Sequence, residues 1–191
     1  MAMHRTVQTA EVPDMTNPSA IDLKRRDMIV GAAAAAAGML LPMSGWALDT
    51  PKGRPILTLS GNIGEPNNGE EARFDMAMLA AMEQHSFITH TPWYDQPRKF
   101  TGPRLIDVLD AVKADGAKIK ARAINDYAIE IPVSDLKAHD VVLARLLDDK
   151  PMAIREKGPL FVIYNFDSSA ELRKSTYYER CIWQLKSIQV I

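Results

Sequence analysis

A basic cluster followed by an apolar, small-residue stretch near the N-terminus decides how much of this chain can enter a folded domain. Residues 28–41 read MIVGAAAAAAGMLL and carry no charge, and the basic run Lys24–Arg26 stands just before them. A proline and then small residues ending at Ala47 follow. This order is typical of a cleavable export signal. We therefore predict that residues 1–47 are a signal with a long polar n-region, and that residues 48–191 form a single folded domain.

The paired arginines indicate which type of signal this is. Arg25 and Arg26 directly precede an Ala/Gly-rich run of moderate hydrophobicity, which resembles the twin-arginine signal. That route exports folded proteins, often with a cofactor already inserted, so we predict a location in the periplasm. The alternative is an uncleaved membrane anchor. Because a bilayer core needs roughly 20 apolar residues and Pro42 ends this run, we expect no stable membrane anchor.

Charge balance and cysteine count exclude several classes of protein. The chain has 23 Lys and Arg against 24 Asp and Glu, which gives a net charge of -1. This balance provides no bulk attraction to nucleic acid or to an anionic membrane, so we expect no nucleic-acid partner. Cys181 is the single cysteine. One cysteine excludes an internal disulfide, Cys-rich zinc modules, iron–sulfur clusters and CxxC redox chemistry.

Beyond residue 47, short β-prone runs alternate with a few short helical patterns. Helices are predicted at residues 76–83, which Asp75 precedes as N-cap, and from Thr101–Pro103 to Val112. The predicted strands are residues 56–60, 86–91, 118–123, 127–131, 141–147, 160–164 and 182–190. Regular βαβ alternation is missing from this order. We therefore predict an α+β fold with a mixed β-sheet and short helices.

The connecting segments are predicted from turn residues and prolines. Residues 61–69 are dense in Gly, Asn and Pro and predict an exposed loop, and residues 93–102 predict a polar-aromatic loop. Residues 148–151 predict a reverse turn. Ser134 is expected to cap a single helical turn, and residues 166–180 are predicted to be irregular or partly helical.

Most catalytic and metal-binding motifs have no match in the chain. His85, His90 and His139 lack both the i, i+4 spacing and the carboxylate frame of a metal site, so we assign no metal ligand. No GxSxG, Walker or GxGxxG motif occurs. A hydrolase with an unmarked Ser/His/Asp triad remains an open alternative. Cys181 is interpreted as a buried structural residue.

Cationic residues recur beside the predicted turns. The set comprises Arg98, Lys99, Arg104, Arg122, Arg155, Lys157, Arg173 and Lys174. Guanidinium groups and backbone amides in such loops are what phosphate or pyrophosphate binding requires. A solvated charged face is the alternative interpretation. The pattern therefore predicts a small anionic ligand or cofactor as one possible partner of the domain.

Six segments in order resemble the oxidoreductase molybdopterin-binding domain of sulfite oxidases and their periplasmic relatives. They are residues 57–61 (LTLSG), 89–93 (THTPW), 100–109 (FTGPRLIDVL), 123–127 (AINDY), 158–160 (GPL) and 183–188 (WQLKSI). The resemblance spans nearly all of the chain beyond residue 47. It implies the sulfite-oxidase molybdopterin-binding fold and a molybdopterin cofactor. A cofactor-bearing family also suits a twin-arginine signal.

The resemblance, taken with the cations beside turns, implies a set of site residues. Ligand-binding residues are predicted to be Trp93 and Tyr127 as pocket walls, with Arg98, Arg104, Asn125, Asp126, Arg155 and Lys157. In the family a cysteine thiolate binds molybdenum from the loop that corresponds here to residues 88–93, where this chain has Thr89, His90 and Thr91. His90 or Thr91 would lie near the metal in place of that cysteine, as the catalytic residues. Ile182 also stands where the family has a lysine.

Two functions from different classes follow from these observations. The first is an exported molybdopterin-dependent oxidoreductase that binds a pterin-type or other anionic ligand and has a redox partner protein. The alternative is a non-catalytic periplasmic ligand-binding or sensory module that kept the fold, lost the molybdenum cofactor and has a signalling partner. The missing thiolate motivates the alternative, because a threonine hydroxyl is a poor substitute for a soft anionic ligand.

Overall fold

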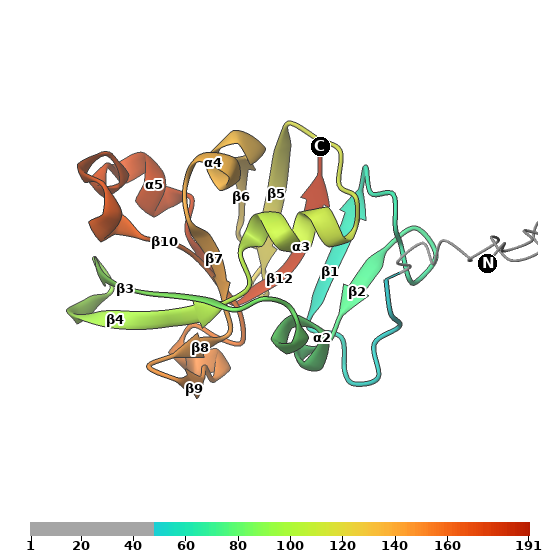
Figure 1. The fold of residues 1–191 in the computed structure, drawn as a ribbon, viewed down its shortest axis with the longest axis horizontal. Helices are drawn as coiled ribbons and strands as arrows, with labels where there is room; N and C mark the ends of the chain where they lie inside the picture. The colour runs from blue at the N-terminus through green and yellow to red at the C-terminus, as the bar shows by residue number, and fades with distance from the viewer. Residues whose placement is uncertain (1–47) are drawn as a thin grey trace, which may run out of the picture. The chain divides into compact units, whose positions relative to one another are not determined.

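The computed structural model describes residues 48–191 (Figure 1). The predictions of an export signal, a twin-arginine motif and a cleavage point after Ala47 fall on residues 1–47 and lie outside the described residues. The described chain is α+β, with mixed sheets and a few short helices, so the coarse fold class predicted above is confirmed. None of the described helices is long and apolar enough to cross a membrane.

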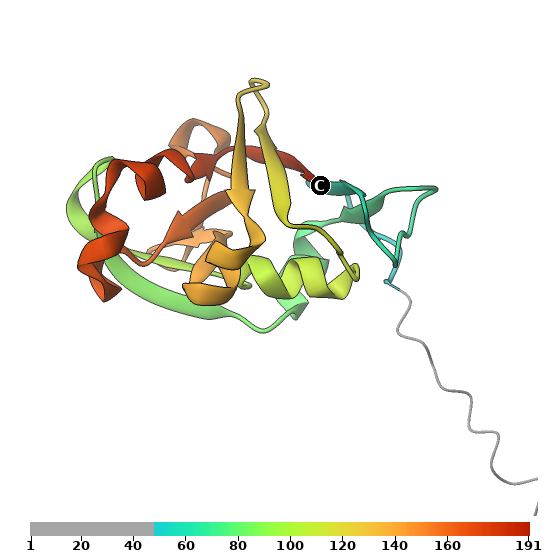
Figure 2. The same ribbon diagram turned by 90° about the horizontal axis from the view of Figure 1, so that it is seen from above.

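A five-stranded sheet forms the largest layer. In spatial order its strands are β2 (Ala72–Phe74), β1 (Leu57–Gly61), β12 (Leu185–Val190), β5 (Lys118–Ala123) and β6 (Ala128–Pro132). β1 and β12 are parallel, and the other pairs are antiparallel. β5 alternates buried Ile119, Ala121 and Ala123 with more exposed lysine and arginine side chains. This period of two is expected of a strand in a sheet with one solvent-exposed face. Figure 2 shows the β5–β6 hairpin projecting from the rest of the sheet.

Two smaller sheets complete the β-structure. One has the order β11 (Ile182–Trp183), β10 (Phe161–Tyr164) and β7 (Val141–Ala144). The other has the order β3 (His85–Thr91), β4 (Tyr94–Gly102), β8 (Leu146–Leu147) and β9 (Lys150–Pro151). Every residue of β7 and β10 is buried. Their continuous apolar runs are typical of strands covered on both faces.

Short helices connect the sheets and cover their faces. The α-helices are α2 (Met76–Ala81), α3 (Leu105–Ala111), α4 (Val133–Ala138) and α5 (Ser175–Glu179). The 3-10 helices are η2 (Ile154–Glu156), η3 (Phe166–Ser168) and η4 (Ala170–Arg173). α3 buries Leu105, Val108 and Leu109 in the core, as expected of an amphipathic helix, and it lies within the helix predicted to end at Val112. η3, η4 and α5 confirm that residues 166–180 are irregular and partly helical.

The predicted loop at residues 93–102 is wrong, because most of it is the strand β4. Phe87 of β3 lies opposite Phe100 of β4, and Thr91 lies opposite Tyr94. Polar residues dominate this segment because the hairpin exposes much of its surface, and only Phe100 and Gly102 are fully buried. Pro97 lies in the stretch where the register shifts, between Thr89 and Thr91 of the partner strand, a place where proline is tolerated.

Four further details differ from the predictions. The single strand expected at residues 141–147 is two strands, β7 and β8, because the chain changes sheets at Arg145, whose Nε donates to Gln84 Oε1 at 2.7 Å. The final strand is divided into β11 and β12 by Gln184, which has a φ of +55°. Pro132, rather than Ser134, occupies the N-cap of α4. The turn expected at residues 148–151 is confined to Asp148 and Asp149, and β9 follows it.

Candidate functional site

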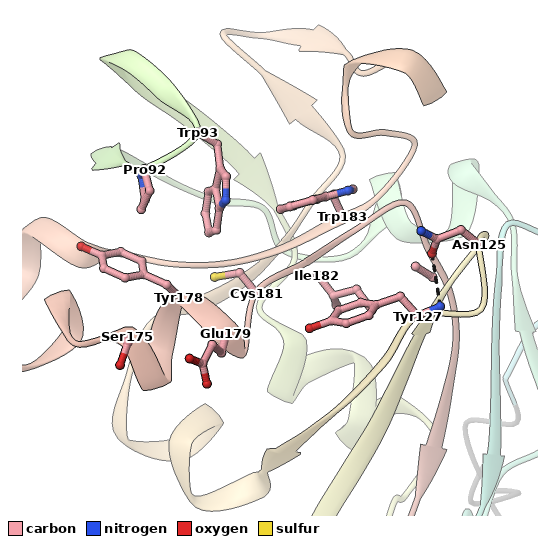
Figure 3. A pocket seen from close by; sticks show the side chains of 11 residues that line it. Pro92, Trp93, Asn125, Tyr127, Ser175, Tyr178, Glu179, Cys181, Ile182 and Trp183 are labelled. Carbon is pink, nitrogen blue, oxygen red and sulfur yellow. Dashed lines mark hydrogen bonds between the residues drawn. The ribbon is translucent and has the colours of Figure 1, made fainter.

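A groove of about 540 Å³ opens among four segments (Figure 3). Two of these segments, the β3–β4 turn and α5, lie at the same end of the described domain (Figure 1). We call this depression the aromatic groove. It is lined by Pro92, Trp93, Ala123, Asn125, Tyr127, Ser175, Tyr178, Glu179, Cys181, Ile182 and Trp183. The β3–β4 turn, the β5–β6 hairpin, α5 and β11 supply these side chains. Because each segment is held by its own sheet or helix, the walls are largely pre-formed, as is usual for small-molecule sites.

Trp93 is the centre of the aromatic groove. Its ring makes edge-to-face contacts with Phe161 and Trp183, each at 5.6 Å between centroids, and with Tyr178 at 6.3 Å. Edge-to-face pairs are favourable arrangements of aromatic quadrupoles. This packing holds Trp93, Tyr178 and Trp183 in fixed orientations (Figure 3), so a flat ligand would meet a rigid aromatic wall.

The tip of the β5–β6 hairpin supplies the polar side of the groove. The backbone N–H of Tyr127 donates to Asn125 Oδ1 at 3.2 Å, an Asx turn that fixes the amide side chain (Figure 3). Asp126 between them has a φ of +66°, a conformation that Asp tolerates better than most residues. The Asn125 amide nitrogen and the Tyr127 hydroxyl are therefore available as hydrogen-bonding groups at the mouth of the groove.

A second depression, of about 520 Å³, contains three of the eight cations that lie beside predicted turns, together with Lys150. We call it the cationic hollow. It is lined by Tyr94, Arg98, Leu147, Asp148, Lys150, Pro151, Met152, Arg155, Glu156 and Lys157. The guanidinium of Arg98 lies 5.2 Å from the centre of the Tyr94 ring and pairs with Asp148 at 2.5 Å. Burial raises the pKa of Tyr94 even though the nearby Arg98 charge lowers it, so its phenol stays neutral.

Lys157 joins the cationic hollow to the aromatic groove. Its Nζ lies 5.0 Å from the centre of the Tyr94 ring and 5.7 Å from that of Trp183. Tyr94 lines the hollow and Trp183 lines the groove. Both distances are within the range of cation–π contacts. The ammonium group is therefore held at the boundary between the two depressions.

A third depression, of about 280 Å³, contains a histidine–aspartate pair. We call it the histidine hollow, lined by His90, Thr91, Pro92, Phe166, Asp167, Arg173 and Tyr178. It shares Pro92 and Tyr178 with the aromatic groove. His90 Nδ1 lies 2.9 Å from Asp167 Oδ2, and the backbone N–H of His90 donates to the same oxygen at 2.8 Å. This arrangement leaves Nε2 of an exposed imidazole free.

Contacts with Thr89, His90 and Arg173 fix the position and the charge of Asp167. The backbone N–H of Asp167 donates to the hydroxyl of buried Thr89 at 3.1 Å. Partial burial opposes ionisation of Asp167, but the hydrogen bonds from His90 and the charge of Arg173 outweigh it and lower the pKa of this carboxyl. An ionised carboxylate that accepts from the ring orients the imidazole.

The Cys181 thiol lines the aromatic groove but is chemically protected. The residue is buried, and its Sγ lies 3.5 Å from the carbonyl oxygen of Tyr177. Burial raises the pKa of this thiol well above its ordinary value, so it stays protonated at neutral pH. The interpretation of Cys181 as a buried residue is confirmed, and its place in a groove wall (Figure 3) is a feature that the sequence did not indicate.

The predicted site residues are distributed over the three depressions. Trp93, Asn125 and Tyr127 line the aromatic groove, Arg98, Arg155 and Lys157 line the cationic hollow, and His90 and Thr91 line the histidine hollow. Two residues are not brought together with the others. Arg104 forms a bidentate salt bridge with Asp107 at the start of α3. The Asp126 carboxylate lies 3.8 Å from Arg122 and 3.9 Å from Lys186.

Three wall residues were missed by the sequence analysis. Trp183 belongs to a segment that resembles the family, so it could have been selected as an aromatic partner for Trp93. Tyr178 and Asp167 lie in the polar segment 166–180, which has no periodicity. Their roles depend on contacts with residues more than 70 positions away, such as His90 and Thr89. No local signal could have found them.

The donor atoms do not fit a thiolate-bound molybdenum. The resemblance would place the metal ligand at Thr89, His90 or Thr91, whose side chains are engaged with the backbone or with Asp167. The buried, protonated thiol of Cys181 is not a metal ligand in this state. Within residues 48–191, no three His, Cys, Asp or Glu side chains lie close enough to hold a metal ion.

Comparison with protein-family models and with curated proteins gave no match.

Proposed function

We propose that residues 48–191 are a periplasmic ligand-binding module with the sulfite-oxidase molybdopterin-binding fold, exported by the twin-arginine route. Its ligand is a flat aromatic molecule that carries an anionic group, of which a pterin with a carboxylate or phosphate is the example the resemblance suggests. The ring binds in the aromatic groove against Trp93 and Trp183. The anionic group binds at Lys157, with Arg98 and Arg155 nearby.

The position of Lys157 is the observation that carries this proposal. Its Nζ lies 5.7 Å from the Trp183 ring centre and also faces Tyr94 in the cationic hollow. A ring bound beside Trp183 would have its substituent within reach of the ammonium group. A charge-assisted hydrogen bond at that point is stronger than a neutral one and would select anionic ligands.

Pairing between the segments that carry the resemblance supports the proposed fold. Residues 57–61 and 183–188 contribute to neighbouring parallel strands, with Leu59 opposite Ile188. Residues 123–127 begin at Ala123, which lies opposite Leu185. Three of the six segments that resemble the family thus lie together in the five-stranded sheet and the hairpin beside the groove.

The donor set favours a binding module over a molybdenum-dependent oxidoreductase. Molybdenum in this family needs a soft anionic ligand, and residues 88–93 offer hydroxyls and an imidazole instead. The aromatic groove and the cations fit the organic part of such a cofactor without fitting its metal. The proposed ligand is therefore metal-free, and no redox step is derived.

Pterin-6-carboxylate is a direct probe of this proposal, because it combines a fused ring with one carboxylate and is fluorescent. We expect it to bind the purified domain with one-to-one stoichiometry, and we expect binding to require no metal ion. The unsubstituted pterin should bind about tenfold more weakly, since it lacks the charge-assisted bond. A fluorescence titration that finds no saturable binding of pterin-6-carboxylate contradicts the proposal.

A further inference from the structure

Gln184 is the point at which three separate segments beside the site are tied together. Its backbone N–H donates to the carbonyl of Lys157 at 3.1 Å, and its own carbonyl accepts from the N–H of Ile124 at 2.9 Å. Its side-chain Nε2 donates to the carbonyl of Ile154 at 2.8 Å. One residue therefore bonds to both ends of the η2 loop and to the tip of the β5–β6 hairpin.

The backbone at Gln184 is held in an uncommon conformation. Its φ of +55° lies in the left-handed region, which non-glycine residues seldom occupy. The same residue separates β11 from β12. Lys157, its hydrogen-bond partner, is also left-handed, with a φ of +72°. Two left-handed residues joined by a hydrogen bond fix the direction in which the Lys157 side chain leaves the η2 loop.

The segments that Gln184 joins belong to different parts of the site. Trp183 and the β5–β6 hairpin supply walls of the aromatic groove. The η2 loop supplies Arg155 and Lys157 to the cationic hollow. Without the side-chain bond to Ile154, the exposed η2 loop would be joined to Gln184 only through the Lys157 carbonyl. The distance between the aromatic groove and the cationic hollow therefore depends on Gln184.

We propose that Gln184 is a positioning residue that makes the aromatic groove and the cationic hollow one binding site. The inference rests on the proposed function and specifies its ligand class: one molecule that carries both the ring and the anionic group, rather than a ring and a separate anion. Gln184 itself lines neither the aromatic groove nor the cationic hollow. Gln184 determines how much more tightly the domain binds a ring that carries an anionic group than the same ring without that group.

The test compares two probes on the wild-type domain and on matched variants. The probes are pterin-6-carboxylate and pterin, and the measured quantity is the ratio of their dissociation constants. Gln184→Met keeps the length of the side chain but removes its donor. Gln189→Met is the control, because Gln189 is an exposed glutamine on β12, the strand that follows Gln184, and lines none of the three depressions.

We expect Gln184→Met to reduce the ratio from about tenfold to about twofold through weaker binding of pterin-6-carboxylate, with pterin affinity unchanged. Gln189→Met should keep the wild-type ratio. A purely structural role would weaken both probes equally and leave the ratio where it was.

Gln184→Asn provides a second variant in case the methionine variant does not fold. Asn adopts the left-handed conformation readily, but its amide is one methylene too short to reach the Ile154 carbonyl. It should fold and show the same reduced ratio. A wild-type ratio in a folded Asn or Met variant overturns the positioning role and leaves the proposed function standing. If the wild-type domain binds neither probe, the proposed function fails and this inference fails with it.

Discussion

Lys157 and Trp183 are the two side chains that would bind the two parts of the proposed ligand. Trp183 would contact the ring, and the Lys157 ammonium would bind the anionic group. The ammonium of Lys157 lies over the faces of two aromatic rings, so part of its charge is already balanced by their quadrupoles. Within residues 48–191 the Lys157 Nζ forms no ion pair, unlike Arg98, which pairs with Asp148. Lys157 is therefore the cation that a bound anion would meet first.

Replacing Trp183 tests the ring-binding half of the site. Trp183→Ala should weaken pterin-6-carboxylate binding by about tenfold or more, because stacking of a base-like ring on an aromatic side chain is worth roughly 1–3 kcal/mol. Trp183 is 37% exposed, so the variant should fold. Ile88→Ala, at a residue that is 63% exposed and lines none of the depressions, is the control. Isothermal titration calorimetry measures the affinity of both variants for pterin-6-carboxylate. Equal affinities would contradict the placement of the ring beside Trp183.

Replacing Lys157 tests the anion-binding half. Lys157→Asn removes the charge but keeps a residue that tolerates a positive φ. We expect pterin-6-carboxylate to bind about tenfold more weakly, while pterin is unaffected. Lys113→Asn is the matched control, since Lys113 is another left-handed lysine, at φ +48°, and it pairs with Glu65 outside the site. If Lys113→Asn weakens the anionic probe as much as Lys157→Asn does, the anion is not bound at Lys157.

Sequence reasoning at this scale selected residues by type and by nearness to turns. That criterion selected Trp93, Tyr127 and Lys157, which the structure places in the walls of the aromatic groove and the cationic hollow. It fails for Arg104, whose charge is used locally by Asp107 three residues later. It also fails for Asp167, because the bond that gives this carboxylate a role comes from His90, which is 77 positions away.

Among the elements, α5 forms one wall of the aromatic groove and is anchored at its C-terminal end. Arg180, the C-cap of α5, bonds to the carboxylate of Asp135 on α4. The hydroxyl of buried Tyr164 on β10 donates to the same carboxylate at 3.2 Å. Burial and the neighbouring Asp135 charge raise the pKa of the Tyr164 phenol, so it remains a donor. This cluster ties α5, α4 and β10 together.

Removing the shared carboxylate should therefore destabilise the fold. Asp135→Ala leaves the Tyr164 hydroxyl buried without its acceptor and Arg180 without its partner, and we expect a loss of about 2–3 kcal/mol. Asp110→Ala, on the exposed side of α3, is expected to change stability by less than about 0.5 kcal/mol. Urea denaturation followed by far-ultraviolet circular dichroism measures both. Similar midpoints for the two variants would show that the cluster does not anchor α5.

Asp75 links the start of α2 to the N-terminal end of the described chain. Its carboxylate accepts from the N–H groups of Met78, Gly53 and Lys52 at 2.9, 2.7 and 2.9 Å. These bonds, with that from Met78 the largest, outweigh burial and lower the pKa of Asp75. A carboxyl whose pKa is lowered by folding stabilises the folded state above its unfolded pKa, and that stability is lost as the pH falls through the folded value.

The variant Asp75→Asn tests this dependence. We expect it to be less stable than the wild type at pH 7, because the amide carries no charge and accepts through one oxygen only. The difference should shrink below about pH 4, the ordinary range of an aspartate, as the wild-type carboxyl becomes protonated. Thermal unfolding between pH 7 and pH 3 measures it. A difference that stays constant over this range would mean that the ionised state of Asp75 contributes nothing.

Helices and strands could be predicted where local periodicity or a capping residue marks them. They could not be predicted where the element depends on hydrogen bonds to another segment of the chain. The helix after Asp75 and the hairpin at residues 118–132 follow from a capping residue and from period-2 alternation. β4 could not be predicted, because its polar residues become a strand only through pairing with β3. The division of the last strand depends on the hydrogen bonds that meet at Gln184, and a β-prone sequence carries no sign of them.

Across the whole molecule, segments far apart in the chain converge on the three adjoining depressions. Trp93, Tyr127, Lys157 and Trp183 come from four different segments, while the five-stranded sheet gives the hairpin and the final strand a common base. A site assembled in this way requires the complete fold. The molybdenum chemistry that the resemblance implies would require in addition a thiolate, which residues 88–93 lack.

Metal and ligand content therefore tests the central claim most directly. The protein would be recovered from the periplasm of a host that makes molybdopterin and has the twin-arginine machinery, and analysed by elemental and native mass spectrometry. We predict folded protein without stoichiometric molybdenum, carrying or accepting a metal-free aromatic anion such as pterin-6-carboxylate. One molybdenum per chain would contradict this account and would identify a redox enzyme with an unusual ligand at residues 89–91.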